Sequence, residues 1–281
     1  MAGAETALPY EGSKRHDILD IESRALVGGN RDFRANHAAA KTPKGEIKVT
    51  EEQILIDYIP AVLYGEPSRR AYLFVHGQCG CKEEGAAFAE TACPAGYQVL
   101  AIDLPEHGVR KGQESRFDPW TVVPELQAVL GYMKSRWTDI SLRANSIGAH
   151  FSMLAFAGEE LHKALFVSPI VNMERLIADM MQWAGVTEQE LETRREIVTD
   201  FGQTLSWNYL TWERRHPIQN WRCPTAILYA GQDNMTGREI VEQFVATQNA
   251  TLTVMENGEH WFHTPEQLAV LQAWETSAMK E

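Results

Sequence analysis

The chain has 281 residues, of which 44% are hydrophobic, so it can bury one large core or two small ones. Its 38 acidic and 26 basic side chains give a formal net charge of −12. A surface of that sign repels nucleic-acid phosphates and anionic membranes, so we expect no nucleic-acid partner. No apolar run approaches the ~18 residues that are needed to cross a bilayer, which argues against a membrane span.

The N-terminal residues and the cysteines bear on the cellular compartment. Residues 1–17 contain no basic segment followed by an apolar stretch, which is the pattern of a secretory signal. The four cysteines, in a chain of this length, do not make a disulfide framework. These two observations predict a cytoplasmic location.

Residues 1–45 are polar, rich in alanine and charge, and show no sustained period, so they are interpreted as an N-terminal extension. The pattern changes at Gly45. The apolar residues up to Ile56 predict a strand, and residues 59–64 predict a second strand that pairs with it as an antiparallel hairpin.

Six further apolar runs alternate with helical patterns. They span residues 71–75, 97–102, 140–143, 164–167, 226–229 and 250–255. Strands that are apolar throughout and that alternate with helices predict a parallel sheet covered on both faces. The fold class is therefore α/β.

Residues 171–215 interrupt this alternation. An apolar stripe at helical spacing predicts one helix, and Thr187 with Glu190 predicts the capped start of a second. We interpret the segment as a helical cap between two strands of the core, which covers residues 46–170 and 216–281. The substrate-pocket candidates in it are Met180, Trp183 and Trp207, although packing of these apolar side chains onto the core is the alternative.

The sequence Ala144-Asn145-Ser146-Ile147-Gly148 follows an apolar strand directly and precedes an apolar helix. A serine on such a tight strand-to-helix turn is held exposed above the sheet, in a strained backbone that small neighbours permit. Ser146 is therefore the candidate nucleophile. The alternative is a serine that only caps the helix.

His76-Gly77-Gln78 ends the first parallel strand. A sharp turn there can aim the Gln78 N–H at a developing oxyanion, with the Ile147 N–H as its partner. We interpret His76 as a structural residue of the loop.

Two acid–base candidates follow later strands in the chain order Ser, Asp, His. Asp233 lies just after 226–229, and His260 just after 250–255. A serine hydroxyl needs an imidazole to take its proton and a carboxylate to hold the imidazole in the right tautomer. His263 competes for the role of base, but it begins the final helical pattern, so we prefer His260.

These motifs, together with the turn Asp103-Leu104-Pro105-Glu106-His107-Gly108, resemble those of the α/β-hydrolase superfamily over residues 46–281. The members that look most similar are bacterial carboxylesterases and monoacylglycerol-lipase-like serine hydrolases. The resemblance implies an eight-stranded, mostly parallel sheet and an acyl-enzyme mechanism. Ala144 stands where the usual elbow has glycine, and Glu106 where the usual turn has glycine.

The predicted function is hydrolysis of a small or medium carboxylic ester, a small-molecule substrate, without a metal or organic cofactor. Two alternatives remain: the same triad acting on a peptide, thioester or carbon–carbon bond, and a catalytically silent ligand-binding member. Cys79 and Cys81 lie on the predicted oxyanion loop, and we interpret them as non-catalytic thiols in preference to a metal-binding or redox-active pair. Oxidation of Cys79 is a secondary hypothesis for loss of activity.

Overall fold

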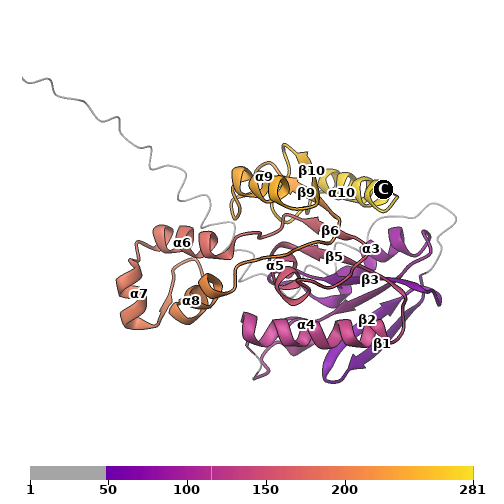
Figure 1. Cartoon of the computed structure of the whole chain (residues 1–281), viewed down its shortest axis with the longest axis horizontal. Coiled ribbons are helices and arrows are strands. Elements are labelled where there is room, and N and C mark those ends of the chain that lie inside the picture. Colours follow the sequence, from indigo (N-terminus) through magenta and orange to yellow (C-terminus); the bar gives the residue numbers. More distant parts are fainter. Residues whose placement is uncertain (1–48, 115, 281) are drawn as a thin grey trace, which may run out of the picture. The chain divides into compact units, whose positions relative to one another are not determined.

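The computed structural model describes residues 49–114 and 116–280 (Figure 1). The extension predicted for residues 1–45 lies outside them. Contacts divide the described chain into two units, which we call the core unit and the small unit. The core unit contains residues 49–179 and 208–280, and the small unit contains 180–207.

An eight-stranded sheet forms the centre of the core unit, in the order β1-β2-β4-β3-β5-β6-β9-β10. β2 pairs antiparallel with β1 and with β4, and the other pairs are parallel. The strands are β1 (Glu51–Ile56), β2 (Ile59–Tyr64), β3 (Arg70–Val75), β4 (Gln98–Ile102), β5 (Asp139–Asn145), β6 (Ala164–Val167), β9 (Thr225–Ala230) and β10 (Ala250–Met255). The predicted eight-stranded, mostly parallel sheet is confirmed.

Helices cover both faces of this sheet, as continuous apolar strands require. The buried hydrophobic residues of α4 (Pro119–Lys134), α5 (Ser146–Ala155) and α9 (Arg238–Thr247) belong to one cluster, on one face. Those of α3 (Gly85–Ala92) and α10 (Pro265–Ala278) belong to a second cluster, on the other face.

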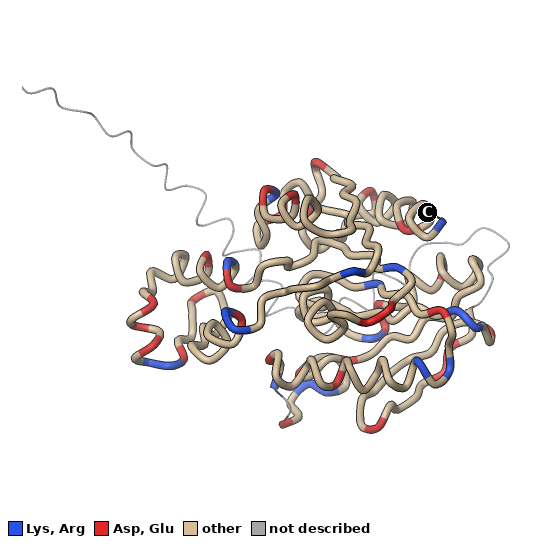
Figure 2. Tube along the Cα trace, in the orientation of Figure 1, with Lys and Arg blue, Asp and Glu red and all other residues tan. Residues whose placement is uncertain are grey.

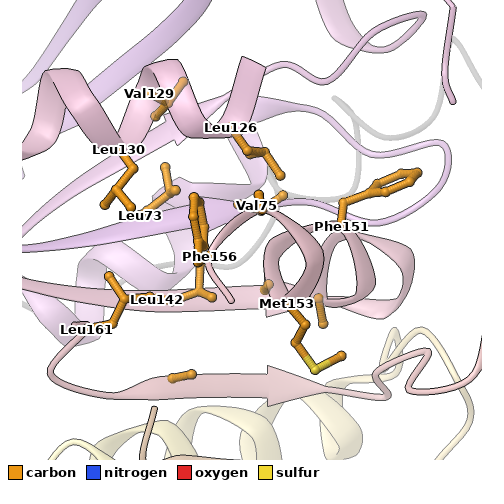
Figure 3. Packing of buried hydrophobic residues seen from close by; sticks show 14 of the residues in the cluster. Leu73, Val75, Leu126, Val129, Leu130, Leu142, Phe151, Met153, Phe156 and Leu161 are labelled. Atoms are coloured by element: carbon orange, nitrogen blue, oxygen red, sulfur yellow. The ribbon is translucent and has the colours of Figure 1, made fainter. Parts of the chain in front are cut away.

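Helix α4 illustrates how the sequence builds these layers. Asp118 caps it by accepting from the N–H of Thr121 at 2.9 Å, and proline occupies its first position. Leu126 and Leu130, one turn apart, point toward the sheet and pack in the same cluster as Leu73 (Figure 3).

The segment between β6 and β9 contains α6 (Met173–Ala184), α7 (Glu188–Arg194) and α8 (Trp207–Arg215). The side chain of Thr187 accepts from the N–H of Glu190 at 3.2 Å, so α7 begins with the predicted cap. The segment also contains an antiparallel pair that the sequence did not predict, β7 (Glu196–Val198) with β8 (Thr204–Ser206). Its action as a cap stays a prediction.

Basic and acidic residues are both distributed along the described chain trace (Figure 2). Of the helices in the described part of the chain, none is long and apolar enough to cross a bilayer.

Candidate active site

Ser146 lies where β5 meets α5, and its φ is +49°. This left-handed conformation is costly for a residue with a side chain, and such strain is concentrated at functional sites. Gly148 allows the turn to approach β3, because a β-carbon there would lie 2.3 Å from the carbonyl oxygen of His76. The carbonyl of Ser146 accepts from the N–H of Ile170 at 3.2 Å, which ties the turn to the end of β6.

The structure brings Ser146, His260 and Asp233 together. His260 Nε2 lies 2.8 Å from Ser146 Oγ, and His260 Nδ1 lies 2.7 Å from Asp233 Oδ2. An ionised carboxylate only accepts, so Nδ1 carries the ring proton and Nε2 accepts from the serine hydroxyl. The Asp233 side chain is fully buried, whereas that of His260 is 19% exposed and so accessible to a substrate.

The loop after β9 fixes the Asp233 carboxylate. Its Oδ1 accepts from the N–H of Met235 at 2.8 Å and from the N–H of Thr236 at 3.0 Å, which leaves Oδ2 for His260. Gly231 permits the ends of β9 and β10 to meet, since a β-carbon there would lie 2.4 Å from the carbonyl oxygen of Glu256.

His263, the competing base in the sequence, makes different contacts. Its Nδ1 lies 3.3 Å from Glu259 Oε2, and its ring packs on that of Trp261 with centroids 4.3 Å apart. Its backbone N–H donates to Gln267 Oε1 at 3.0 Å, at the start of α10. The geometry therefore links His260, and not His263, to Ser146.

The loop after β3 lies against the nucleophile, because a β-carbon on Gly77 would be 3.3 Å from that of Ser146. His76 is buried and holds this loop. Its Nε2 accepts from the N–H of Leu104 at 3.1 Å, so Nδ1 carries the proton that it donates to the Gly77 carbonyl at 2.7 Å. Burial lowers the pKa of His76 to about 3.

The two predicted oxyanion donors belong to two neighbouring segments, the loop after β3 and the first turn of α5. Gln78 is exposed on the loop after β3, next to Gly77. Ile147 is the second residue of α5, so its N–H has no acceptor within the helix. Their role remains a proposal.

Asp103 anchors the loop after β3 through contacts that the sequence did not predict. Its carboxylate is fully buried and accepts from the backbone N–H of Lys82 at 2.8 Å and from Lys82 Nζ at 3.0 Å. It also accepts from the N–H of Val109 at 3.1 Å. Lys82, which was not predicted, thus joins the loop after β3 to the loop after β4.

Arg143 is a second residue that the sequence did not single out. It is a buried cation on β5, three positions before Ser146. Its Nε donates to Glu275 Oε1 on α10 at 2.8 Å, and one terminal nitrogen donates to Asn145 Oδ1 at 2.5 Å. An arginine within a strand that was predicted to be buried was the signal in the sequence.

The pocket candidates Met180, Trp183 and Trp207 belong to the small unit. Trp183 is 52% exposed and lies edge-on to Phe201, with ring centroids 6.2 Å apart. A role for these three residues in binding substrate stays a prediction.

None of the four cysteines, all of which lie in the described part of the chain, forms a disulfide. Cys79 is exposed and has a φ of +62°. Burial raises the pKa of the Cys81 thiol to about 12. Residues 49–114 and 116–280 contain no group of three or more His, Cys, Asp or Glu that could hold a metal ion.

No protein-family model and no curated protein matches the sequence. Solved structures do match. Est1E from Butyrivibrio proteoclasticus, solved with ferulic acid, is 21% identical with a TM-score of 0.67, over 82% of this chain and 98% of that chain. Mouse alpha/beta hydrolase domain-containing protein 10 is 12% identical with a TM-score of 0.67, over 82% and 98%. The Pyrococcus furiosus esterase Pf2001 is 17% identical with a TM-score of 0.58, over 86% and 95%. Together with the sheet order, these similarities show that the chain has the α/β-hydrolase fold.

Proposed function

We propose that the protein is a serine hydrolase that cleaves a small or medium carboxylic ester through an acyl-enzyme intermediate. The observation that carries the proposal is the continuous hydrogen-bonded path from Asp233 through His260 to Ser146, with distances of 2.7 and 2.8 Å. This path supplies a base for the hydroxyl and an acceptor for the charge that the base acquires.

In this mechanism Ser146 Oγ attacks the ester carbonyl and passes its proton to His260 Nε2. The negative oxygen of the tetrahedral intermediate binds the N–H groups of Gln78 and Ile147. His260 then gives the proton to the leaving alcohol, and the acyl group stays on Ser146. Water attacks the acyl-enzyme with His260 as base, which releases the acid and restores the hydroxyl. No step calls for a metal or an organic cofactor.

Esterases among the structural neighbours support ester hydrolysis, and a thioesterase domain is also among them. Peptide, thioester and carbon–carbon substrates use the same nucleophile, so a substrate panel must separate them. The ferulic acid bound to one neighbour makes feruloyl esters a useful part of that panel.

The test is the turnover of p-nitrophenyl acetate by the wild type, by Ser146→Ala and by the exposed control Ser135→Ala. We expect Ser146→Ala to lose about 10⁴-fold or more in kcat while keeping its fold, and the control to retain activity. A fluorophosphonate should label the wild type at Ser146. Near wild-type turnover by Ser146→Ala, or absence of labelling, would contradict the proposal.

A further inference from the structure

Asn145 occupies the N-cap position of α5 without capping it. Asparagine there normally accepts a hydrogen bond from the second or third N–H of the helix. In α5 the side chain makes no such bond. The second N–H of this helix belongs to Ile147, one of the two proposed oxyanion donors. A capping Asn145 would therefore compete with the reacting oxygen for the same N–H.

Arg143 occupies the amide oxygen that would otherwise cap the helix. One of its terminal nitrogens donates to Asn145 Oδ1 at 2.5 Å and to the Ala144 carbonyl at 3.2 Å. Its Nε donates to Glu275 Oε1 at 2.8 Å. A planar guanidinium can make these bonds at once, whereas the single ammonium of lysine lacks that forked geometry.

The buried contacts of Arg143 carry a desolvation penalty, which makes them a poor way to stabilise the fold. Arg143 and Glu275 have side chains that are 3% and 5% exposed, and the guanidinium lies near the rings of Phe74 and Phe88, with centroids 5.7 and 5.8 Å away. Buried ion pairs often contribute no more to stability than apolar residues of the same volume. This penalty indicates that Arg143 has a role at the neighbouring candidate active site.

We infer that Arg143 is a positioning residue for the proposed acyl transfer, which holds the Asn145 amide away from α5 and so leaves the Ile147 N–H available to the oxyanion. Glu275 orients Arg143 for this purpose. The inference rests on the proposed function, because the oxyanion exists only in that reaction.

The first experiment replaces both buried charges, as Arg143→Met with Glu275→Met, so that neither is left unpaired in the core. We expect kcat for p-nitrophenyl acetate to fall about 10- to 100-fold, somewhat less than the complete loss of one oxyanion donor. KM should stay within about threefold, because the lost interaction forms only in the transition state. Melting temperature and circular dichroism report the fold.

The second experiment adds Asn145→Leu, which removes the competing oxygen at similar volume. The triple variant should recover about tenfold or more of the lost kcat, since the N–H of Ile147 is again free. Arg143→Lys with and without Asn145→Leu repeats the comparison in a background that keeps a cation beside Glu275. A purely structural role for Arg143 would give no recovery in either background.

Replacing Arg70 and Asp139, paired at 3.3 Å at the other end of β5, provides a matched control. Arg70→Gln with Asp139→Asn should leave kcat within about threefold, as expected for a partly exposed pair. Wild-type turnover and labelling of Ser146 are measured in the same series, and their absence would reject the proposed function itself. An active wild type whose kcat is unaffected by loss of Arg143, or is not recovered by Asn145→Leu, would overturn this inference alone.

Discussion

Gly148 lies against the carbonyl group of His76, so closely that a β-carbon on Gly148 would be 2.3 Å from the carbonyl oxygen. The same β-carbon would be 2.8 Å from the carbonyl oxygen of Val75, so the first turn of α5 rests directly on the end of β3. This contact places the turn that contains Ile147 next to the loop that contains Gln78.

Gly148→Ala should therefore separate the two proposed oxyanion donors. We expect a loss of about 1–3 kcal/mol in the free energy of unfolding from overpacking. We also expect a fall in kcat for p-nitrophenyl acetate with little change in KM, because the donors act on the transition state. Urea unfolding and steady-state kinetics measure the two effects.

Gly131→Ala is the matched control for that substitution. Gly131 lies within α4 and is exposed, and a β-carbon added there would have no neighbouring atom within 4 Å. Alanine there should raise stability by about 0.5–1 kcal/mol and leave kcat unchanged. Equal changes in stability and in kcat for Gly131→Ala and Gly148→Ala would show that the contact of Gly148 with His76 does not cause the loss.

Asp233→Asn should preserve the loop and remove most of the activity. The asparagine oxygen can still accept from the N–H groups of Met235 and Thr236. Its NH₂ then faces His260 Nδ1 and favours the tautomer that cannot take the proton of Ser146. We expect kcat to fall about 10⁴-fold with an unchanged melting temperature. A fall of less than tenfold would show that Asp233 does not orient the base.

The sequence predicted the strands that carry the site because each is a continuous apolar run bounded by turn residues. For β6 and β10 the predicted bounds match those of the structure. The pair β7–β8 was missed because each strand has three residues and only one buried side chain, Ile197 or Leu205, too short for a period to show.

The order Ser146, Asp233, His260 was visible in the sequence since each residue follows a strand of a parallel sheet, whose carboxyl ends share one edge. The charged residues that support the site were not visible in the sequence. Arg143 finds its partner 132 residues away in Glu275, and Lys82 finds Asp103, which is 21 residues away. Pairings of this kind depend on which helix covers which strand, and no local pattern encodes that.

Glu84 should make stability depend on pH. One of its carboxylate oxygens lies 2.8 Å from where a β-carbon on Gly80 would be, in the loop after β3, and burial raises the pKa of Glu84 to about 7. Between about pH 4.5 and 7 the unfolded chain ionises this group while the folded chain keeps it neutral. Stability is thus lost as pH rises through that window, by up to about 3 kcal/mol.

Glu84→Gln removes this effect and keeps the neutral shape. Its free energy of unfolding, measured in urea, should exceed that of the wild type increasingly from about pH 4.5 to pH 7, and by a constant amount above. Glu90→Gln, at an exposed position on α3, serves as control. Parallel curves for wild type and Glu84→Gln across this range would contradict the prediction.

Cys79 should be the thiol through which peroxide inactivates the enzyme. It is exposed beside Gln78, whereas burial raises the pKa of Cys81 to about 12 and keeps that thiol protonated and less reactive. A bulkier oxidised side chain at a left-handed residue should displace the loop and lower kcat. Cys79→Ser should resist peroxide. Unchanged turnover with Cys79 shown by mass spectrometry to be oxidised would refute this.

His76 has a further consequence for experiments on this enzyme. Both of its ring nitrogens are engaged by main-chain groups, and its pKa of about 3 keeps it uncharged throughout the range in which esters are assayed. His76 itself therefore contributes no change of charge at the end of β3 over this range. An inflection in a pH–rate profile near neutrality therefore comes from groups other than His76. An imidazole-directed reagent that abolishes turnover is not expected to act at His76, because main-chain groups already engage both of its ring nitrogens.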